Sequence, residues 1–197
     1  MIALIEDDEA VLRSLSMLLT KRGHAVKSYR SAEEFLQALA ANTPLCVVSD
    51  IRMPGMSGLE LHRTLKRSNP ALPVILITGH GDIAMAVEAI KQGAFDFIEK
   101  PFDDEQLTAR IRSAIESGQR MRAEQEQKTN LAKRMAELSP RQVEVMELVA
   151  EGLSNKEIAL KLKISPRTVE NYRAWVMEKM GANNLADLVR KVMVLKS

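Results

Sequence analysis

The sequence predicts two domains: an α/β domain built on a doubly wound parallel sheet of five strands, and a smaller all-α domain of four helices. The first prediction rests on short apolar runs that alternate with amphipathic segments five times before about residue 115. Such alternation is typical of a parallel sheet covered by helices on both faces. The second rests on the helical pattern after Leu138. We therefore expect domains at 1–117 and 137–197, joined by a polar, partly helical linker at 118–136.

The strand and helix units account for most of the first domain. The run Leu45-Cys46-Val47-Val48 lacks polar alternation, which favours a strand buried on both faces. The predicted strand and helix ranges, in chain order, are 2–5 and 11–20, 25–29 and 31–40, 45–49 and 59–67, 74–77 and 83–92, and 95–98 and 104–115.

The segment between the domains is rich in Gln, Glu, Lys and Arg and has few large apolar residues. Ile111, Ile115, Leu131, Met135 and Leu138 nevertheless lie at helical spacings. Part of this segment could continue the preceding helix and pair with a second subunit. We favour the simpler interpretation, a solvated and partly helical connector.

The starts of the four predicted C-terminal helices carry capping signals. Ser139-Pro140-Arg141-Gln142 and Ser154-Asn155-Lys156-Glu157 both match a capping box. Ser165-Pro166 combines a cap with a proline at the first helical position, and Asn184 with Asp187 marks the fourth start. The short interval between Leu162 and Ser165 predicts a helix-turn-helix.

Composition and charge narrow the classes of function. The chain is 46% hydrophobic and 27% charged, as in ordinary soluble proteins. Residues 1–118 carry 13 Lys and Arg against 16 Asp and Glu, a net of −3, whereas the remainder carries 15 against 10, a net of +5. A polyanion is therefore the expected partner of the C-terminal part. The single cysteine, Cys46, excludes an intrachain disulfide and favours a buried structural thiol. Without a signal peptide or a long apolar run, we expect a cytoplasmic protein with no membrane partner.

Five polar residues follow the predicted strands: Glu6 and Asp7 the first, Asp50 the third, Thr78 the fourth and Lys100 the fifth. The carboxyl ends of parallel strands share one edge of the sheet, so we expect these side chains to converge. Clustered carboxylates favour a hard divalent cation, and Mg²⁺ suits carboxylate and water ligands. With a hydroxyl and an ammonium beside it, Asp50 is expected to attack a phosphoryl group in line.

Two alternatives apply to this cluster. Asp7 and Asp8 could merely favour the N-terminus of the first helix, with Lys100 a surface charge, but five residues at successive strand ends favour a site. Phosphatases that form an aspartyl-phosphate place an acid two residues after the nucleophile. Position 52 is Arg, so the phosphoryl group is expected to persist as a signal, and we expect no enzyme.

The helix after Ser165 has two distinct faces. A projection at about 100° per residue gathers Val169, Tyr172, Val176 and Met180 toward the core. The opposite face is predicted to contact base edges in a major groove through Arg167, Glu170, Asn171 and Ala174. Phosphate contacts are predicted for Lys156, Thr168, Arg173 and Lys179, and for amides near Asn155. The alternative is a helical bundle with a solvated charged face.

Residues 1–118 resemble the receiver domain of bacterial response regulators, which has a flavodoxin-like fold. The motifs that carry the resemblance are Glu6-Asp7-Asp8-Glu9, the stretch from Asp50 to Gly58, Thr78-Gly79-His80-Gly81, and the stretch from Phe95 to Phe102. The resemblance implies phosphorylation of Asp50 and Mg²⁺ ligation by Asp7, Asp50 and the Arg52 carbonyl, with Glu6 helping through water. It also implies that Thr78 and Lys100 hold the phosphoryl oxygens, that Phe97 is an aromatic switch and that a cis peptide precedes Pro101. Glu6 departs from the aspartate that is commoner there. His24 and His80 are interpreted as surface or loop residues.

Residues 138–196 resemble the LuxR/NarL-type DNA-binding domain, through the stretches Leu138 to Gln142, Gly152 to Ala159 and Ser165 to Glu170. The whole chain is similar to FixJ-type regulators, although Tyr172 replaces the usual histidine. This resemblance implies a sensor histidine kinase, double-stranded DNA and RNA polymerase as partners. It also implies a homodimer upon phosphorylation, formed through the 83–92 helix, the last strand and the 104–115 helix. A constitutive DNA binder and a protein-binding adaptor remain as alternatives.

Overall fold

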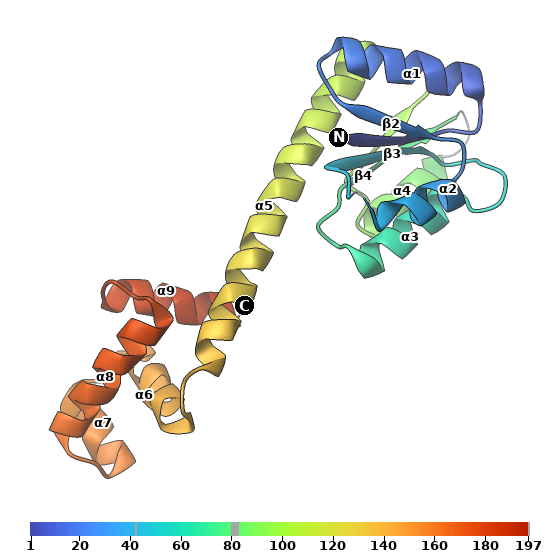
Figure 1. Ribbon diagram of the computed structural model, residues 1–197. Coiled ribbons are helices and arrows are strands. Elements are labelled where there is room, and N and C mark those ends of the chain that lie inside the picture. Colours follow the sequence, from blue (N-terminus) through green and yellow to red (C-terminus); the bar gives the residue numbers. More distant parts are fainter. Residues whose placement is uncertain (42, 80–82, 197) are drawn as a thin grey trace. The chain divides into compact units, whose positions relative to one another are not determined.

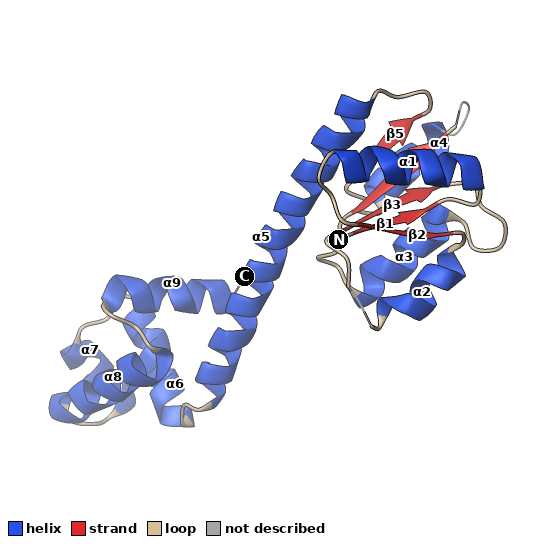
Figure 2. Ribbon diagram, turned by 45° about the horizontal axis from the view of Figure 1, so that its top comes forward, coloured by secondary structure: helices blue, strands red, loops and turns tan. Residues whose placement is uncertain are grey.

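The computed structural model describes residues 1–41, 43–79 and 83–196, so His80 lies outside the described residues. The chain divides into two compact units, Met1–Arg122 and Ala123–Ser197. The first contains a parallel sheet and the second is helical, which confirms the predicted fold classes. Ribbon diagrams show the strands of the first unit and the helices of the second (Figures 1 and 2).

The sheet of the first unit has the strand order β2-β1-β3-β4-β5, with every neighbouring pair parallel. This order puts β1 and β4 on either side of β3, and β5 beyond β4. The strands are β1 (Ile2–Ile5), β2 (Val26–Tyr29), β3 (Cys46–Asp50), β4 (Val74–Thr78) and β5 (Asp96–Glu99).

Helices cover both faces of this sheet, α1 on one side and α2, α3 and α4 on the other (Figure 1). Successive strand residues point to opposite faces, so Leu4 belongs to the apolar cluster with α1 and Ile5 to the cluster with α2 and α3. Both faces being buried explains why these strands lack polar alternation. The helices are α1 (Glu9–Lys21), α2 (Ala32–Leu39), α3 (Gly58–Ser68), α4 (Ile83–Lys91) and α5 (Asp104–Ala136).

Local capping sets where the first helices begin. The Asp8 carboxylate caps α1 by accepting from the Ala10 and Val11 amides at 2.8 and 3.1 Å, and these bonds lower the pKa of Asp8. Ser57 and Glu60 form a capping box at the start of α3. The helix-capping interpretation therefore holds for Asp8.

Helix α5 corrects the extent of the last predicted helix of the first domain. It does not end near Ile115 but runs through all of 118–136, so this segment is helical throughout rather than in part. The segment lacks proline and is rich in Ala, Glu, Gln, Lys and Arg, which favour helix. Its last apolar residues, Leu131 and Met135, pack into the core of the second unit.

Four shorter helices complete the second unit around a single apolar cluster, in which Val145, Ile158, Val176 and Leu188 are buried. Both predicted capping boxes are present, from Ser139 to Gln142 and from Ser154 to Glu157. The helices are α6 (Pro140–Ala150), α7 (Asn155–Leu162), α8 (Pro166–Met180) and α9 (Leu185–Lys196). The short connection from α7 to α8 gives the predicted helix-turn-helix.

Candidate functional site

Three carboxylates meet where β1 and β3 end. Glu6 and Asp7 directly follow β1, and Asp50 is the last residue of the neighbouring strand β3. One carboxylate oxygen from each lies within 4.8 Å of the others. Glu6 and Asp50 are buried, whereas Asp7 is the most exposed of the three. The parallel pairing of β1 with β3 is what brings them together.

Lys100 directly follows β5, two strands away from β3, and its side chain reaches back to this cluster. Its ammonium donates to Asp50 Oδ1 at 2.7 Å and to Glu6 Oε2 at 2.9 Å. The Lys100 amide donates to the Thr78 carbonyl at 2.8 Å, which fixes the backbone just beyond β5. The peptide between Lys100 and Pro101 is cis. Lys100 is therefore an ion-pair partner within the cluster and not an isolated surface charge.

Burial and ion pairing shift the pKa values of Glu6 and Lys100 in opposite directions. Burial raises the pKa of Glu6, the Asp50 charge adds to that rise, and the hydrogen bond from Lys100 opposes it. Burial acts to lower the pKa of Lys100, but its hydrogen bonds to Asp50 and Glu6 prevail and raise it. Lys100 pairs with two of the three carboxylates, Glu6 and Asp50, so one ammonium faces three acidic groups in this cluster.

The donor set fits a hard divalent cation. Among the described residues, the grouped ligand atoms are all carboxylate oxygens, the type that Mg²⁺ prefers. Asp50 Oδ2 accepts from the Arg52 amide at 2.7 Å, so the backbone of Arg52 lies next to the same carboxylate. The residues present are therefore suited to holding Mg²⁺.

Thr78 and Phe97 occupy the strands beside this cluster. Thr78 ends β4, adjacent to β3, and is 1% exposed, and its hydroxyl donates a long bond of 3.4 Å to the Gly79 carbonyl. Phe97 lies in β5 and is partly buried against the apolar cluster that includes Met85 and Ala89 of α4. Thr78 thus lies at the strand ends, and Phe97 lies on the face of the sheet that α4 covers.

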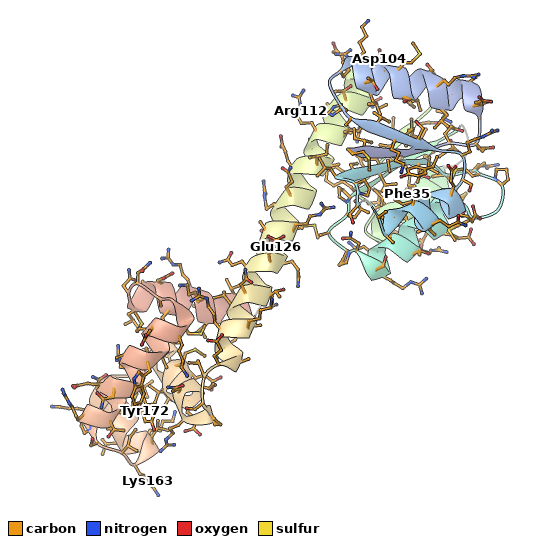
Figure 3. All side chains as sticks on the ribbon, in the orientation of Figure 1. Phe35, Asp104, Arg112, Glu126, Lys163 and Tyr172 are labelled. Carbon is orange, nitrogen blue, oxygen red and sulfur yellow. The ribbon has the colours of Figure 1, made fainter. Side chains whose placement is uncertain are left out.

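The two faces of α8 are divided as the helical projection predicts. Val169, Val176 and Met180 are buried in the core of the second unit, and Tyr172 packs against it. Figure 3 shows the Tyr172 side chain among these helices, whereas Lys163 extends away from them. The exposed face carries Arg167, Glu170, Asn171 and Ala174.

The predicted phosphate-binding residues have different surroundings. Lys156 is exposed, whereas Arg173 donates to the Asn155 side chain at 2.8 Å and so ties α8 to the first residue of α7. The Thr168 hydroxyl lies 2.8 Å from that of Ser165. Lys179 donates to the Glu137 carbonyl at 2.7 Å and to Gln142 Oε1 at 3.1 Å, so its ammonium already has protein partners.

One further exposed residue lies beside this surface, although it is not among the DNA contacts predicted from the sequence. Trp175 is 48% exposed on α8, one helical turn after Asn171. Its position four residues beyond Asn171 was the signal that could have found it.

Across the described ranges of the chain, no helix is both long and apolar enough to cross a membrane.

Comparisons with known proteins match both units. The family model "Response regulator receiver domain" matches residues 2–112, and the model "Bacterial regulatory proteins, luxR family" matches residues 136–192. The "Transcriptional regulatory protein FixJ" of Bradyrhizobium diazoefficiens is 48% identical over 192 residues, which cover 98% of this chain and 94% of that protein.

Solved structures of two regulators resemble the whole chain. Full-length FixJ from B. japonicum is 48% identical with a TM-score of 0.62, and the match covers 99% of this chain and 96% of that one. The response regulator StyR is 35% identical with a TM-score of 0.82, and the match covers 98% of this chain and 97% of that one.

Proposed function

Since this chain belongs to the two-component response regulators, with a receiver domain and a LuxR-family DNA-binding domain, we propose that phosphorylation of Asp50 controls how it binds DNA. The single observation that carries the proposal is the meeting of Glu6, Asp7, Asp50 and Lys100 at one edge of the sheet. We keep 1–117 and 137–197 as the proposed functional domains, with 118–136 as the connection.

Asp50 is the proposed phosphoacceptor, and a sensor histidine kinase is the donor that a receiver domain implies. An Asp50 oxygen attacks phosphorus while the phosphohistidine nitrogen leaves. Asp7, Asp50 and the Arg52 carbonyl would hold Mg²⁺, with Glu6 acting through water, and the bound ion would neutralise charge on the phosphoryl oxygens. Lys100 and the Thr78 hydroxyl bind those oxygens. Lys100 already lies 2.7 Å from Asp50, which supports its role.

The switch follows from the packing beyond the site. When Thr78 turns toward the phosphoryl group, Phe97 moves into the space next to β4 and changes the face formed by α4, β5 and α5. Val87 and Ile90 are 43% and 40% exposed on α4, which supports the proposal that this face forms a homodimer upon phosphorylation.

The proposed DNA contacts lie on α7 and α8. Arg167, Glu170, Asn171 and Ala174 contact base edges in the major groove, and two such helices in a dimer would address half-sites about one DNA turn apart. Lys156, Thr168, Arg173, Lys179 and the amides near Asn155 are the proposed phosphate contacts. We propose that the bound regulator acts in the bacterial cytoplasm, where the DNA lies, and contacts RNA polymerase.

The central test is Asp50→Asn in the full chain. The wild type, treated with acetyl phosphate and Mg²⁺, is expected to incorporate phosphate, dimerise and bind operator fragments selected from genomic DNA more tightly. Asp50→Asn is expected to lose all three responses, whereas the exposed control Glu126→Gln, outside the 104–115 part of α5 in the proposed dimer face, keeps them. Phosphate-dependent dimerisation that survives in Asp50→Asn would rule out this switch. Phosphorylation without any change in DNA affinity would leave a constitutive DNA binder.

A further inference from the structure

Trp175 is the only tryptophan of the chain, and it lies about half exposed on α8. Large aromatic side chains usually bury most of their surface, so an indole left in solvent on a rigid helix suggests a contact made with a partner. Trp175 has no role in the phosphoacceptor site and is not part of the buried core of the second unit.

The position of Trp175 around the helix identifies the surface to which it belongs. At about 100° per residue, Trp175 lies about 40° from Asn171, about 80° from Arg167 and about 100° from the buried Val176. Trp175 therefore lies at the edge of the exposed face, next to Asn171 and on the side of Tyr172. It follows Asn171 by one turn, on the part of α8 that leads away from the N-terminal residues proposed to contact base edges.

The indole is oriented by a second aromatic ring. Tyr172 and Trp175 make an edge-to-face contact, with ring centroids 5.6 Å apart and planes inclined at 76°. Tyr172 itself packs against the core of the second unit. Trp175 is thus held in place by a core residue while its outer surface stays exposed, and such a preorganised ring loses little side-chain entropy when it binds.

The charge of the second unit as a whole favours a polyanion as the partner. Residues 119–197 carry 15 Lys and Arg against 10 Asp and Glu, a net of +5. On the exposed side of α8 itself, Arg167 is accompanied by Glu170 and Glu178, so the attraction comes from the unit and not from this face alone. The indole offers an apolar ring and a single donor, Nε1–H, and no acceptor. An apolar ring beside one donor matches a deoxyribose next to a phosphate oxygen.

We propose that Trp175 contacts DNA, with its indole packed on the deoxyribose–phosphate backbone at the wall of the major groove. This inference rests on the proposed function of α8. A backbone contact carries no base code, so Trp175 adds affinity that depends little on the base pair next to it. It is thereby distinct from Arg167 and Asn171, which are proposed to discriminate bases.

Because the chain has one tryptophan, its emission reports Trp175 alone. The phosphorylated full chain, titrated with a selected operator duplex, is expected to change its tryptophan emission in parallel with binding measured by gel shift. Absence of operator binding by the wild type would refute the proposed function. Operator binding without any change in emission would overturn only the assignment of Trp175.

Substitutions separate the contact from a structural role. Trp175→Ala is expected to weaken operator binding about tenfold through lost apolar contact, and Trp175→Phe is expected to restore most of that affinity. The control Met193→Ala removes a 65% exposed apolar side chain from α9 and should leave affinity unchanged. An unaltered affinity in Trp175→Ala would overturn the proposal. So would a loss that disappears when operator thymines are replaced by uracil, since that result identifies a thymine methyl as the partner.

Discussion

Lys100 makes the acidic edge of the sheet compatible with a folded chain. Glu6 and Asp50 are 3% and 8% exposed, and buried carboxylates without partners would strongly destabilise the domain. Lys100 pairs with both, and its side chain remains one-third exposed, so the ammonium can shift toward a new ligand without crossing a packed core. The same residue thus stabilises the resting site and is ready to bind a phosphoryl oxygen.

Lys100→Met is expected to strengthen Mg²⁺ binding while destabilising the protein without Mg²⁺. Removing one ammonium beside the carboxylates lowers repulsion of the cation by about 1.4 kcal/mol, which corresponds to about tenfold in affinity. Calorimetric Mg²⁺ titration of the full chain measures this. Lys91→Met, which removes an exposed ammonium from α4, is the matched control and should bind Mg²⁺ like the wild type. Weaker Mg²⁺ binding by Lys100→Met would contradict this account.

His62 is a buried polar residue outside the set of site residues predicted from the sequence. It lies in α3 at 2% exposure, its Nε2 lies 3.3 Å from the Gln92 carbonyl, and its Nδ1 has no partner within the described part of the chain. Burial lowers the pKa of His62 below its ordinary value of 6.5. The folded state therefore favours the neutral ring.

This lowered pKa predicts a loss of stability in mild acid. Below about pH 6.5 the unfolded chain binds a proton at His62 that the folded chain does not, so the free energy of unfolding falls until the folded pKa is also passed. Urea unfolding is expected to show this fall in the wild type and to show less of it in His62→Gln. His24→Gln is the control, since His24 lies in the connection before β2. Equal pH dependence in all three proteins would exclude His62 as a contributor.

At the scale of elements, α5 links the two units covalently while its ends belong to different cores. Ile111 packs with the sheet, and Leu131 packs with the helices of the second unit. One hydrogen bond and one close approach of the backbone hold α5 against the first unit beyond the predicted domain boundary. Arg122 donates to the Pro44 carbonyl at 2.9 Å, and a Cβ on Gly118 would lie 2.7 Å from the Pro73 ring.

Gly118→Ala is expected to destabilise the first unit even though alanine is the better helix former. Alanine favours helix by about 1 kcal/mol over glycine, but the added Cβ would meet a rigid proline ring and the Ala71 carbonyl at 3.1 Å. Overpacking of this kind costs about 1–3 kcal/mol, so we expect a net loss. Thermal unfolding measures it, with exposed Ser113→Ala in the same helix as the control. A more stable Gly118→Ala protein would show that α5 does not need this close approach.

At the scale of the whole molecule, the chain carries separate apolar cores, and each unit has its own proposed ligand site. The two clusters around the sheet contain residues of the first unit only, and the third contains residues of the second unit only. The acidic site belongs to the first unit, whereas the proposed DNA surface belongs to the second. A ligand that binds one unit stabilises that unit by mass action.

Calorimetry of the full chain is expected to resolve two unfolding transitions. Mg²⁺ should raise the midpoint of one, and operator DNA should raise the midpoint of the other. The variant Asp50→Asn should weaken only the Mg²⁺ response, and Arg167→Ala with Asn171→Ala only the DNA response. A single transition that moves equally with both ligands would mean that the units unfold as one cooperative body.

The sequence by itself determined the features that depend on near neighbours. The alternation of apolar runs predicted every strand, and the capping boxes at Ser139 and Ser154 predicted where two helices begin. The rule that carboxyl ends of parallel strands share an edge was sufficient to predict that Glu6, Asp7, Asp50, Thr78 and Lys100 converge.

Tertiary structure alone decided the pairings between distant residues. The sequence predicted that Lys100 reaches this edge, but only the folded sheet shows its ammonium bonded to both Glu6 and Asp50, 94 and 50 positions away. The partners of Lys179 and the exposure of Trp175 likewise depend on how α8 packs against its neighbours. Helix α5 continues through a polar segment because it is anchored in a core at each end. Local periodicity and capping are properties of a few adjacent residues, whereas ion pairs, exposure and helix anchoring are decided when remote segments pack together.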